Sequence, residues 1–189
     1  MTLTATLAKD APDGAVPALG VTIDAFAEHP LHDYLDGVGF AAKSGEHRVV
    51  PDADGRSTIV VGLGADADRT VDDFRLVGGA IARAAKKHVA VHTDVLSQAG
   101  ALDPAAVAQA LAEGLGLGQY AYTVLKSDPT PSVLEVVHVV GKGGKRVQQA
   151  LELGTAVADA VAVARDLVNE PGGTLTAYSD NAAVLSGHP

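Results

Sequence analysis

Apolar residues in this chain occur in two patterns: short continuous or alternating runs, and longer segments in which they recur every three or four positions. The first pattern predicts β-strands, and the second predicts amphipathic helices with one buried face. Strands are expected at residues 19–26, 46–50, 57–61, 88–92 and 133–140. The run 57–61 is the clearest, because its β-branched residues show no alternation, which suits a strand covered on both faces.

Helices are expected at residues 30–36, 70–87, 103–117 and 145–168. Thr70, followed three residues later by Asp73, resembles a capping box, and Asp103 before Pro104 is typical of a helix start. Pro171 is expected to stop the last of these helices.

Glycine and proline mark the connections between these elements. Glycines at 114, 116 and 118 are expected to weaken the helix that begins at Asp103 and to end it near Leu117. Residues 8–14 have no periodicity and are expected to lead into the first strand. The alternation of strands and helices with short connections predicts an α/β fold, a mixed sheet with helices on both faces in three layers.

Composition limits the classes of function. The chain has 189 residues, of which 47% are hydrophobic, so a single domain with a real core is expected. Its net charge of −9 repels phosphate backbones, which disfavours nucleic acid as a partner. The absence of cysteine excludes a disulfide framework and a thiolate metal site. No segment resembles a signal peptide or a membrane span, so we expect a cytoplasmic location and no membrane partner.

Two glycine-rich turns invite a phosphate-binding interpretation. Gly62, Gly64 and Ala67 follow a predicted strand in the outline of a dinucleotide-binding turn, but Asp66 and Asp68 would place carboxylates where phosphates must lie. The run 141–145, Gly-Lys-Gly-Gly-Lys, lacks the spacing of a phosphate loop because Arg and Val follow it. We therefore expect plain strand-to-helix turns at both places.

Histidine and carboxylate side chains supply weaker candidates. One helical face would carry a set of potential ligands for a divalent ion, Glu28, His29, His32, Asp33 and Asp36. A solvated polar face is the commoner explanation of such a set. His88 and His92 would lie about 13 Å apart in an extended strand, too far to share one ion. From these residues alone the chain is interpreted as an α/β domain without a catalytic centre of its own.

Three segments, in order along the chain, carry a more specific pattern. The first is Gly62-Leu63-Gly64 after a strand and before a helix that contains Arg75, and the second is the run from Glu113 to Ser127, EGLGLGQYAYTVLKS. The third is 164–176, ARDLVNEPGGTLT. Together they resemble motifs of the leucyl aminopeptidase family of cytosolic metallopeptidases, with Tyr122 where that family usually has Phe.

The resemblance implies a division of the chain. Residues 1–144 would form an amino-terminal domain with a macro-domain-like fold, 145–170 a helix connecting two domains, and 171–189 the start of a truncated catalytic domain. In the family, the catalytic domain holds two divalent metal ions, zinc or manganese, which activate the water that attacks the first peptide bond. Its ligand motifs lie downstream of the third segment and are absent here. The resemblance assigns no catalytic, cofactor-binding or metal-binding residue to this chain, and Lys142 is not given the role of the family's catalytic lysine.

The implied partners are the chain's own carboxy-terminal catalytic domain, further copies in a hexamer, and peptides as substrates of the full-length protein. The implied role is to shape the oligomer and the access to its active sites. On the connecting helix, an apolar stripe is expected to lie on the sheet: Val147, Ala150, Leu151, Gly154, Val157, Val161, Ala164 and Val168. Arg165, Asp166 and Asn169 would then be left to bond the catalytic domain.

One alternative remains open: a macro-like module that binds ADP-ribose or another nucleotide through the glycine turns at 62–64 and 141–144.

Overall fold

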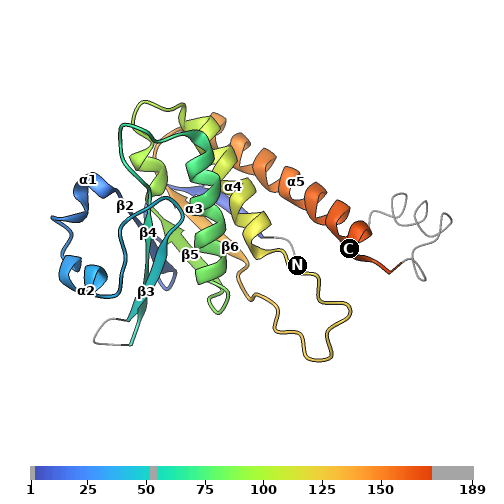
Figure 1. Ribbon diagram of the computed structural model, residues 1–189. Helices are drawn as coiled ribbons and strands as arrows, with labels where there is room; N and C mark the ends of the chain where they lie inside the picture. Colours follow the sequence, from blue (N-terminus) through green and yellow to red (C-terminus); the bar gives the residue numbers. More distant parts are fainter. Residues whose placement is uncertain (1–2, 52–54, 172–189) are drawn as a thin grey trace.

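Six strands form one mixed sheet in the computed structural model, which describes residues 3–51 and 55–171 (Figure 1). The strands are β1 (Thr4–Ala8), β2 (Val16–Val21), β3 (His47–Pro51), β4 (Ser57–Gly62), β5 (Ala90–Thr93) and β6 (Val136–Val140). Their order across the sheet is β1-β6-β5-β2-β4-β3. All neighbours are parallel except β3 and β4, which pair antiparallel with His47 opposite Val61. The expected mixed sheet is confirmed.

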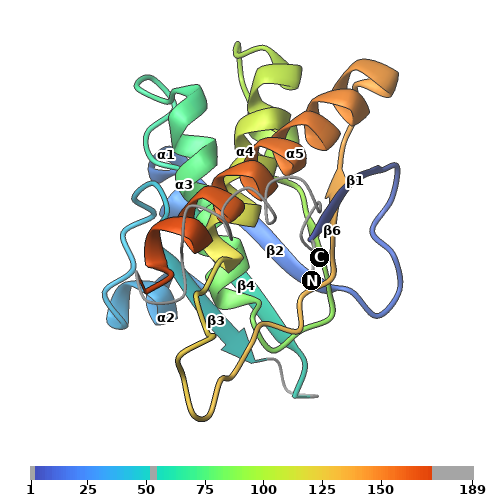
Figure 2. The same cartoon turned by 90° about the vertical axis from the view of Figure 1, so that its right-hand side faces the viewer.

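Helices cover both faces of this sheet. They are α1 (Ile23–Phe26), α2 (His32–Gly37), α3 (Val71–Ala84), α4 (Pro104–Gln119) and α5 (Gly144–Asn169), with a 3₁₀ turn η1 (Val95–Gln98). The three long helices α3, α4 and α5 lie on one face, and the short α1 and α2 lie on the other (Figures 1 and 2). The molecule therefore has the three expected layers.

The two faces have separate apolar cores. The larger core fills the space between the sheet and the long helices and includes Phe74, Leu111, Val137 and Leu151. The smaller core lies beneath α1 and α2 and is centred on Phe40. In β4, Ile59 belongs to the larger core and Val60 to the smaller one, so this strand is buried on both faces as its unbroken apolar run predicts.

The amino-terminal third departs from the sequence prediction. The strand expected at 19–26 ends at Val21, because the Thr22 hydroxyl accepts a hydrogen bond of 3.1 Å from the Ala25 amide and caps α1. Strand β1 was not expected at all, and Ala8, assigned to the entry loop, is its last residue. A five-residue strand at the edge of the sheet carries too little pattern to be recognised.

Helices α3 and α4 pack so closely that their contact excludes side chains. A Cβ atom on Gly114 of α4 would overlap the carbonyl oxygen of Arg75 in α3, and one on Gly78 of α3 would overlap that of Leu111. Gly118 lies against Gly79 in the same way. The glycines expected to end α4 near Leu117 are therefore contact residues inside it, and the helix continues to Gln119.

We expect Gly114→Ala to lower the free energy of unfolding by about 3 kcal/mol, because the added methyl group must push two helix backbones apart. Urea denaturation followed by circular dichroism measures this loss. Gly37→Ala is the matched control, since a Cβ there meets nothing within 4 Å, and it should change stability by less than about 0.5 kcal/mol. Equal losses in the two variants would contradict the close-packing explanation.

Candidate functional site

The glycine turn after β4 does not lead directly into a helix. Helix α3 begins only at Val71, where the Thr70 hydroxyl and amide both donate to Asp73 Oδ2 at 2.7 and 2.8 Å. Burial tends to raise the pKa of Asp73, but the hydrogen bonds from Thr70, together with smaller contributions from Ser44 and the Arg69 charge, leave this pKa below its usual value. The expected capping box is confirmed, and it already fills the amino-terminal end of α3.

The other glycine run forms a turn between a strand and a helix. Gly143 and Gly144 have positive φ angles of 152° and 59° and connect β6 to α5. The side chains of Lys142 and Lys145 are exposed beside this turn.

The histidines singled out from the sequence lie in two places. His32 Nδ1 is 3.4 Å from Asp33 Oδ1 on α2, and burial together with the nearby His32 lowers the pKa of His29. His92 lies in β5 directly opposite His138 of β6, whereas His88 precedes the strand. In residues 3–51 and 55–171, no group of three or more potential ligands is arranged to hold a metal ion.

The residues of the motif from Glu113 onward contact other motifs. Glu113 of α4 is buried and accepts a hydrogen bond of 2.8 Å from Arg75 Nε of α3, and Gln109 donates to its second oxygen at 2.9 Å. Arg75 also pairs with the exposed Asp72. The hydrogen bond to Glu113 raises the pKa of Arg75. The Arg75–Glu113 pair therefore fixes α3 against α4 beside the glycine contact.

Tyr120, at the end of α4, binds the end of α5. Its hydroxyl donates to Asp166 Oδ1 at 2.8 Å and accepts from Asn169 Nδ2 at 3.2 Å. The Arg165 guanidinium lies 5.3 Å from the centre of the Tyr120 ring. Arg165, Asp166 and Asn169, which were expected to be free to bond the catalytic domain, are therefore not free, because all three contact Tyr120.

Tyr122 extends this contact by one residue. Its hydroxyl donates to Glu170 Oε2 at 2.7 Å, and this hydrogen bond raises the pKa of Tyr122 to about 12. The departure from Phe in the family motif therefore adds a bond between the segment after α4 and the end of α5. We call the five residues Tyr120, Tyr122, Asp166, Asn169 and Glu170 the tyrosine clamp.

The apolar stripe of α5 divides into two halves. Val147, Leu151 and Gly154 are buried, and Gly154 lies against the carbonyl oxygen of Gln109 in α4, so this half packs on a helix as well as on the sheet. The expectation that the whole stripe lies on the sheet is wrong, because Val157 is 37% exposed and Val168 is 85% exposed. The end of α5 extends away from the sheet (Figure 1).

A groove follows the exposed half of α5. It encloses about 490 Å³, and its lining residues are Tyr120, Val161, Ala164, Arg165, Val168 and Asn169. This α5 groove is mainly apolar and directly adjoins the tyrosine clamp. Contiguous exposed apolar surface of this kind is typical of a docking surface.

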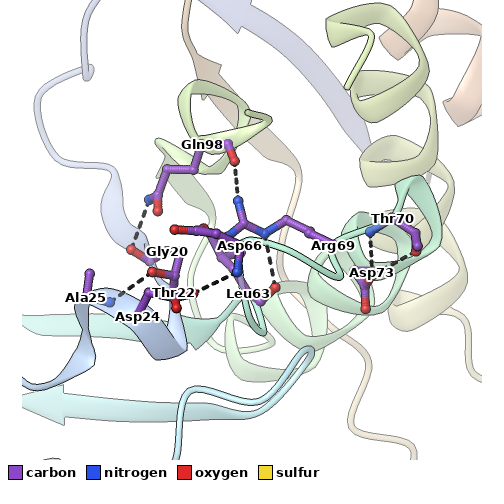
Figure 3. A network of polar contacts seen from close by, with 10 residues as sticks. All are labelled: Gly20, Thr22, Asp24, Ala25, Leu63, Asp66, Arg69, Thr70, Asp73 and Gln98. Carbon is purple, nitrogen blue, oxygen red and sulfur yellow. Dashed lines mark hydrogen bonds and ion pairs between the residues drawn. The ribbon is translucent and has the colours of Figure 1, made fainter. Parts of the chain in front are cut away.

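A second hollow lies at the other end of α4, where three segments that follow parallel strands converge. Its volume is about 700 Å³, and it is lined by Thr22 and Ala25 after β2, by Asp66, Ala67 and Arg69 after β4, and by residues 97–102 after β5. Arg69 is one of its lining residues and donates to the carbonyl oxygens of Leu63 and Gln98 at 3.3 and 2.5 Å (Figure 3). We call it the strand-end cavity.

The sequence alone did not reveal the strand-end cavity or the tyrosine clamp. Arg69 was not singled out because an isolated arginine before a helix has no motif, although Asp66 three residues earlier was a signal for a local ion pair. The tyrosine clamp could have been found from the two motifs that contain it, since Tyr120 and Asp166 carry complementary hydrogen-bonding groups.

Within the described residues, no helix combines the length and the apolar character needed to cross a bilayer.

Comparison with known proteins gives one consistent result. Residues 13–129 match the family model described as the N-terminal domain of the cytosol aminopeptidase family. A probable cytosol aminopeptidase of Corynebacterium diphtheriae is 33% identical over 180 residues, which cover 92% of this chain and 34% of that protein. One of Geobacter sulfurreducens is 34% identical over 123 residues, 62% of this chain and 25% of that protein. The chain thus spans about a quarter to a third of the length of these relatives.

Solved structures show the same partial coverage. The bottromycin maturation enzyme BotP, in a structure with Mn, is 32% identical with a TM-score of 0.73, and the match covers 91% of this chain and 36% of BotP. A tomato leucine aminopeptidase mutant is 22% identical with a TM-score of 0.75, over 98% of this chain and 43% of that one, and supports the fold.

The tyrosine clamp predicts a late-titrating phenol. The absorbance at 295 nm of the wild type minus that of Tyr122→Phe should rise with a midpoint near pH 12, because Glu170 disfavours the phenolate. Since this pKa is raised on folding, the clamp's contribution to stability is intact below pH 10.0, the ordinary tyrosine pKa, and is lost as the pH rises through about 12. In Glu170→Gln the midpoint should fall toward 10. A midpoint near 10 in the unaltered chain would contradict the clamp.

Proposed function

Because the chain belongs to the cytosol aminopeptidase family and matches its N-terminal domain, we propose that it is the non-catalytic part of a metal-dependent aminopeptidase. The observation that carries the proposal is partial coverage. This chain aligns with only 25–34% of the length of curated relatives. In this proposal the domain shapes the assembly and the access to active sites that lie elsewhere in the full-length protein.

The functional surface in this proposal is the α5 groove. Residues 1–144 form the amino-terminal domain and 145–170 the connecting helix, which agrees with α5 being buried only in its first half. The tyrosine clamp sets the direction in which α5 leaves the domain. The groove beside it receives the catalytic domain of the same polypeptide. The third proposed unit, residues 171–189, lies outside the described part of the chain except for Pro171.

The chemistry of the full-length protein is proposed from the family alone. Two divalent ions, manganese or zinc, would be held by the catalytic domain and would activate the water that attacks the amino-terminal peptide bond of a peptide substrate. BotP supports manganese, since that relative was solved with Mn. We also propose a hexamer and a cytoplasmic location. The net charge of −9 continues to disfavour nucleic acid as a partner.

Four of the carboxylates that the described residues bring together already have structural partners. Glu113 binds Arg75 and Gln109, Asp73 caps α3, and Asp166 and Glu170 accept from the two clamp tyrosines. A metal-activating site needs carboxylates that converge on one ion. This supports the assignment of no catalytic, cofactor-binding or metal-binding residue to this chain.

The proposal predicts that the 189-residue chain alone does not hydrolyse leucine p-nitroanilide, with or without added Mn²⁺. The full-length relative of Corynebacterium diphtheriae, assayed in the same buffer, is the positive control. Release of p-nitroaniline is followed by absorbance. Turnover by the isolated chain that depends on Mn²⁺ and disappears with a chelator would refute the proposal.

The docking role predicts the effect of charges in the α5 groove. In a chimera in which this chain replaces the corresponding third of the Corynebacterium diphtheriae relative, Val161→Asp with Val168→Asp should lower the specific activity at least about tenfold. The reason is that docking would bury two unpaired carboxylates. Val49→Asp, on the edge strand β3 and 42% exposed, is the matched control and should leave activity within about twofold. Unchanged activity in the double variant would remove the groove from the docking surface.

A further inference from the structure

The strand-end cavity lies where an α/β sheet most often binds a ligand. From β2 the chain passes through α1 and α2 on one face and then through the edge strand β3 to β4, and from β4 it passes to β5 through α3 on the other face. The segments leaving these adjacent strands therefore diverge and open a crevice at their carboxyl ends. The cavity is lined by residues from all three segments, and neither the proposed catalytic chemistry nor the α5 groove uses it.

A buried cation lines this cavity and retains hydrogen-bonding capacity. The Arg69 side chain is only 6% exposed, and a guanidinium has five N–H donors. Among the described residues three donors have partners, the Leu63 carbonyl, the Gln98 carbonyl and the Asp66 carboxylate. Two donors on the terminal nitrogens therefore remain for an acceptor, and carboxylate and phosphate groups both match a guanidinium edge.

An anionic side chain stands directly beside this cation. Asp66 pairs with Arg69 and is 60% exposed, and its own amide donates to Asp24 Oδ2 at 2.7 Å (Figure 3). The carboxylates of Asp24 and Asp66 exceed the single charge of Arg69, which disfavours a nucleotide or any other polyanion. They favour a ligand that brings a positive group next to its negative one.

The separation of the two charges selects among zwitterions. Because Asp66 and Arg69 are in direct contact, the ammonium and carboxylate of the ligand must also be close together. An α-amino acid carries both groups on one carbon, whereas a dipeptide holds them a full residue further apart. The rest of the cavity combines the polar side chains of Thr22, Ser97 and Gln98 with an apolar part, which is formed by Ala25, Ala67, Ala99, Ala101 and Leu102 and can receive an apolar side chain.

We propose that the strand-end cavity binds a free α-amino acid with an apolar side chain, whose carboxylate contacts Arg69 and whose ammonium contacts Asp66. The backbone already holds Arg69 in place, since the Gln98 amide side chain donates to the Gly20 carbonyl at 2.9 Å and anchors the segment whose carbonyl Arg69 binds. The binding geometry is therefore preorganised. The inference does not depend on the proposed aminopeptidase function.

The test is a titration of the ¹⁵N-labelled 189-residue chain with L-leucine, followed by amide chemical shifts. Saturable shifts at Ala67, Arg69 and Gly100 are expected, with a dissociation constant on the order of 1 mM or tighter. N-acetyl-L-leucine and L-leucinamide each lack one charge and should bind at least about tenfold more weakly. The dipeptide Leu-Gly should also bind more weakly than leucine.

Two matched variants test whether the amino acid binds beside Asp66. Asp66→Asn should weaken leucine binding about tenfold, because it removes the partner of the ammonium. Asp68→Asn makes the same charge change at an exposed residue that does not line the cavity, and it should leave binding within about twofold. Thermal unfolding checks that both variants keep the fold of the parent chain.

Several results would overturn the inference. They are the absence of saturable shifts with leucine, equal binding of the acetylated or amidated compounds, and equal effects of the two aspartate variants. Tighter binding of ADP-ribose than of leucine would instead establish the nucleotide module. The activity assay on the isolated chain can succeed or fail whatever this titration shows, so the two proposals fail separately.

Discussion

The close approach of α3 and α4 is the constraint on which the rest of the structure depends. Gly114 against Arg75 and Gly118 against Gly79 bring the two backbones nearer than any side chain would permit. Glycine in a helix interior costs about 1 kcal/mol relative to alanine, so several such residues in α4 require a compensating contact. That contact is the interface itself, and the buried Glu113 with Arg75 prevents the helices from sliding along it. Because α4 is fixed against α3 in this way, the position of Tyr120 at its end is fixed as well.

The family motifs acquire a physical meaning from this arrangement. Glu113 and Gly114 make the helix contact, and Tyr120 and Tyr122 bind Asp166, Asn169 and Glu170 in the segment 164–176. The motifs that are remote in the sequence therefore form one structural unit that joins α4 to the end of α5. None of these residues has to take part in chemistry to explain the pattern. An unusual motif can describe how a domain is assembled as readily as how it reacts.

The sequence predicted those elements whose signals are local. The capping box at Thr70, the proline start at Pro104 and the unbroken apolar run of β4 all act within a few residues, and each is present. Thr22 was the exception, since a threonine within an apolar alternation reads as part of a strand until its side chain is seen to cap α1. The strand-end cavity and the tyrosine clamp depend on residues brought together over long distances, such as Arg69 with Gln98 and Tyr122 with Glu170. Periodicity contains no information about such contacts, because it records which face is buried and not what lies opposite.

The two candidate sites lie at opposite ends of the same helix. Residues 97–102 line the strand-end cavity just before α4 begins at Pro104, and Tyr120 lines the α5 groove just after it ends. A helix of 16 residues is about 24 Å long, so no side chain reaches from one site to the other. Coupling between them would need α4 to adopt two arrangements. The glycine contact permits only one arrangement of α4, because any shift of α4 along α3 would replace a glycine with a residue whose Cβ has no space. The two sites should therefore act independently, so that the free-energy changes caused by Asp66→Asn and by a groove variant are additive.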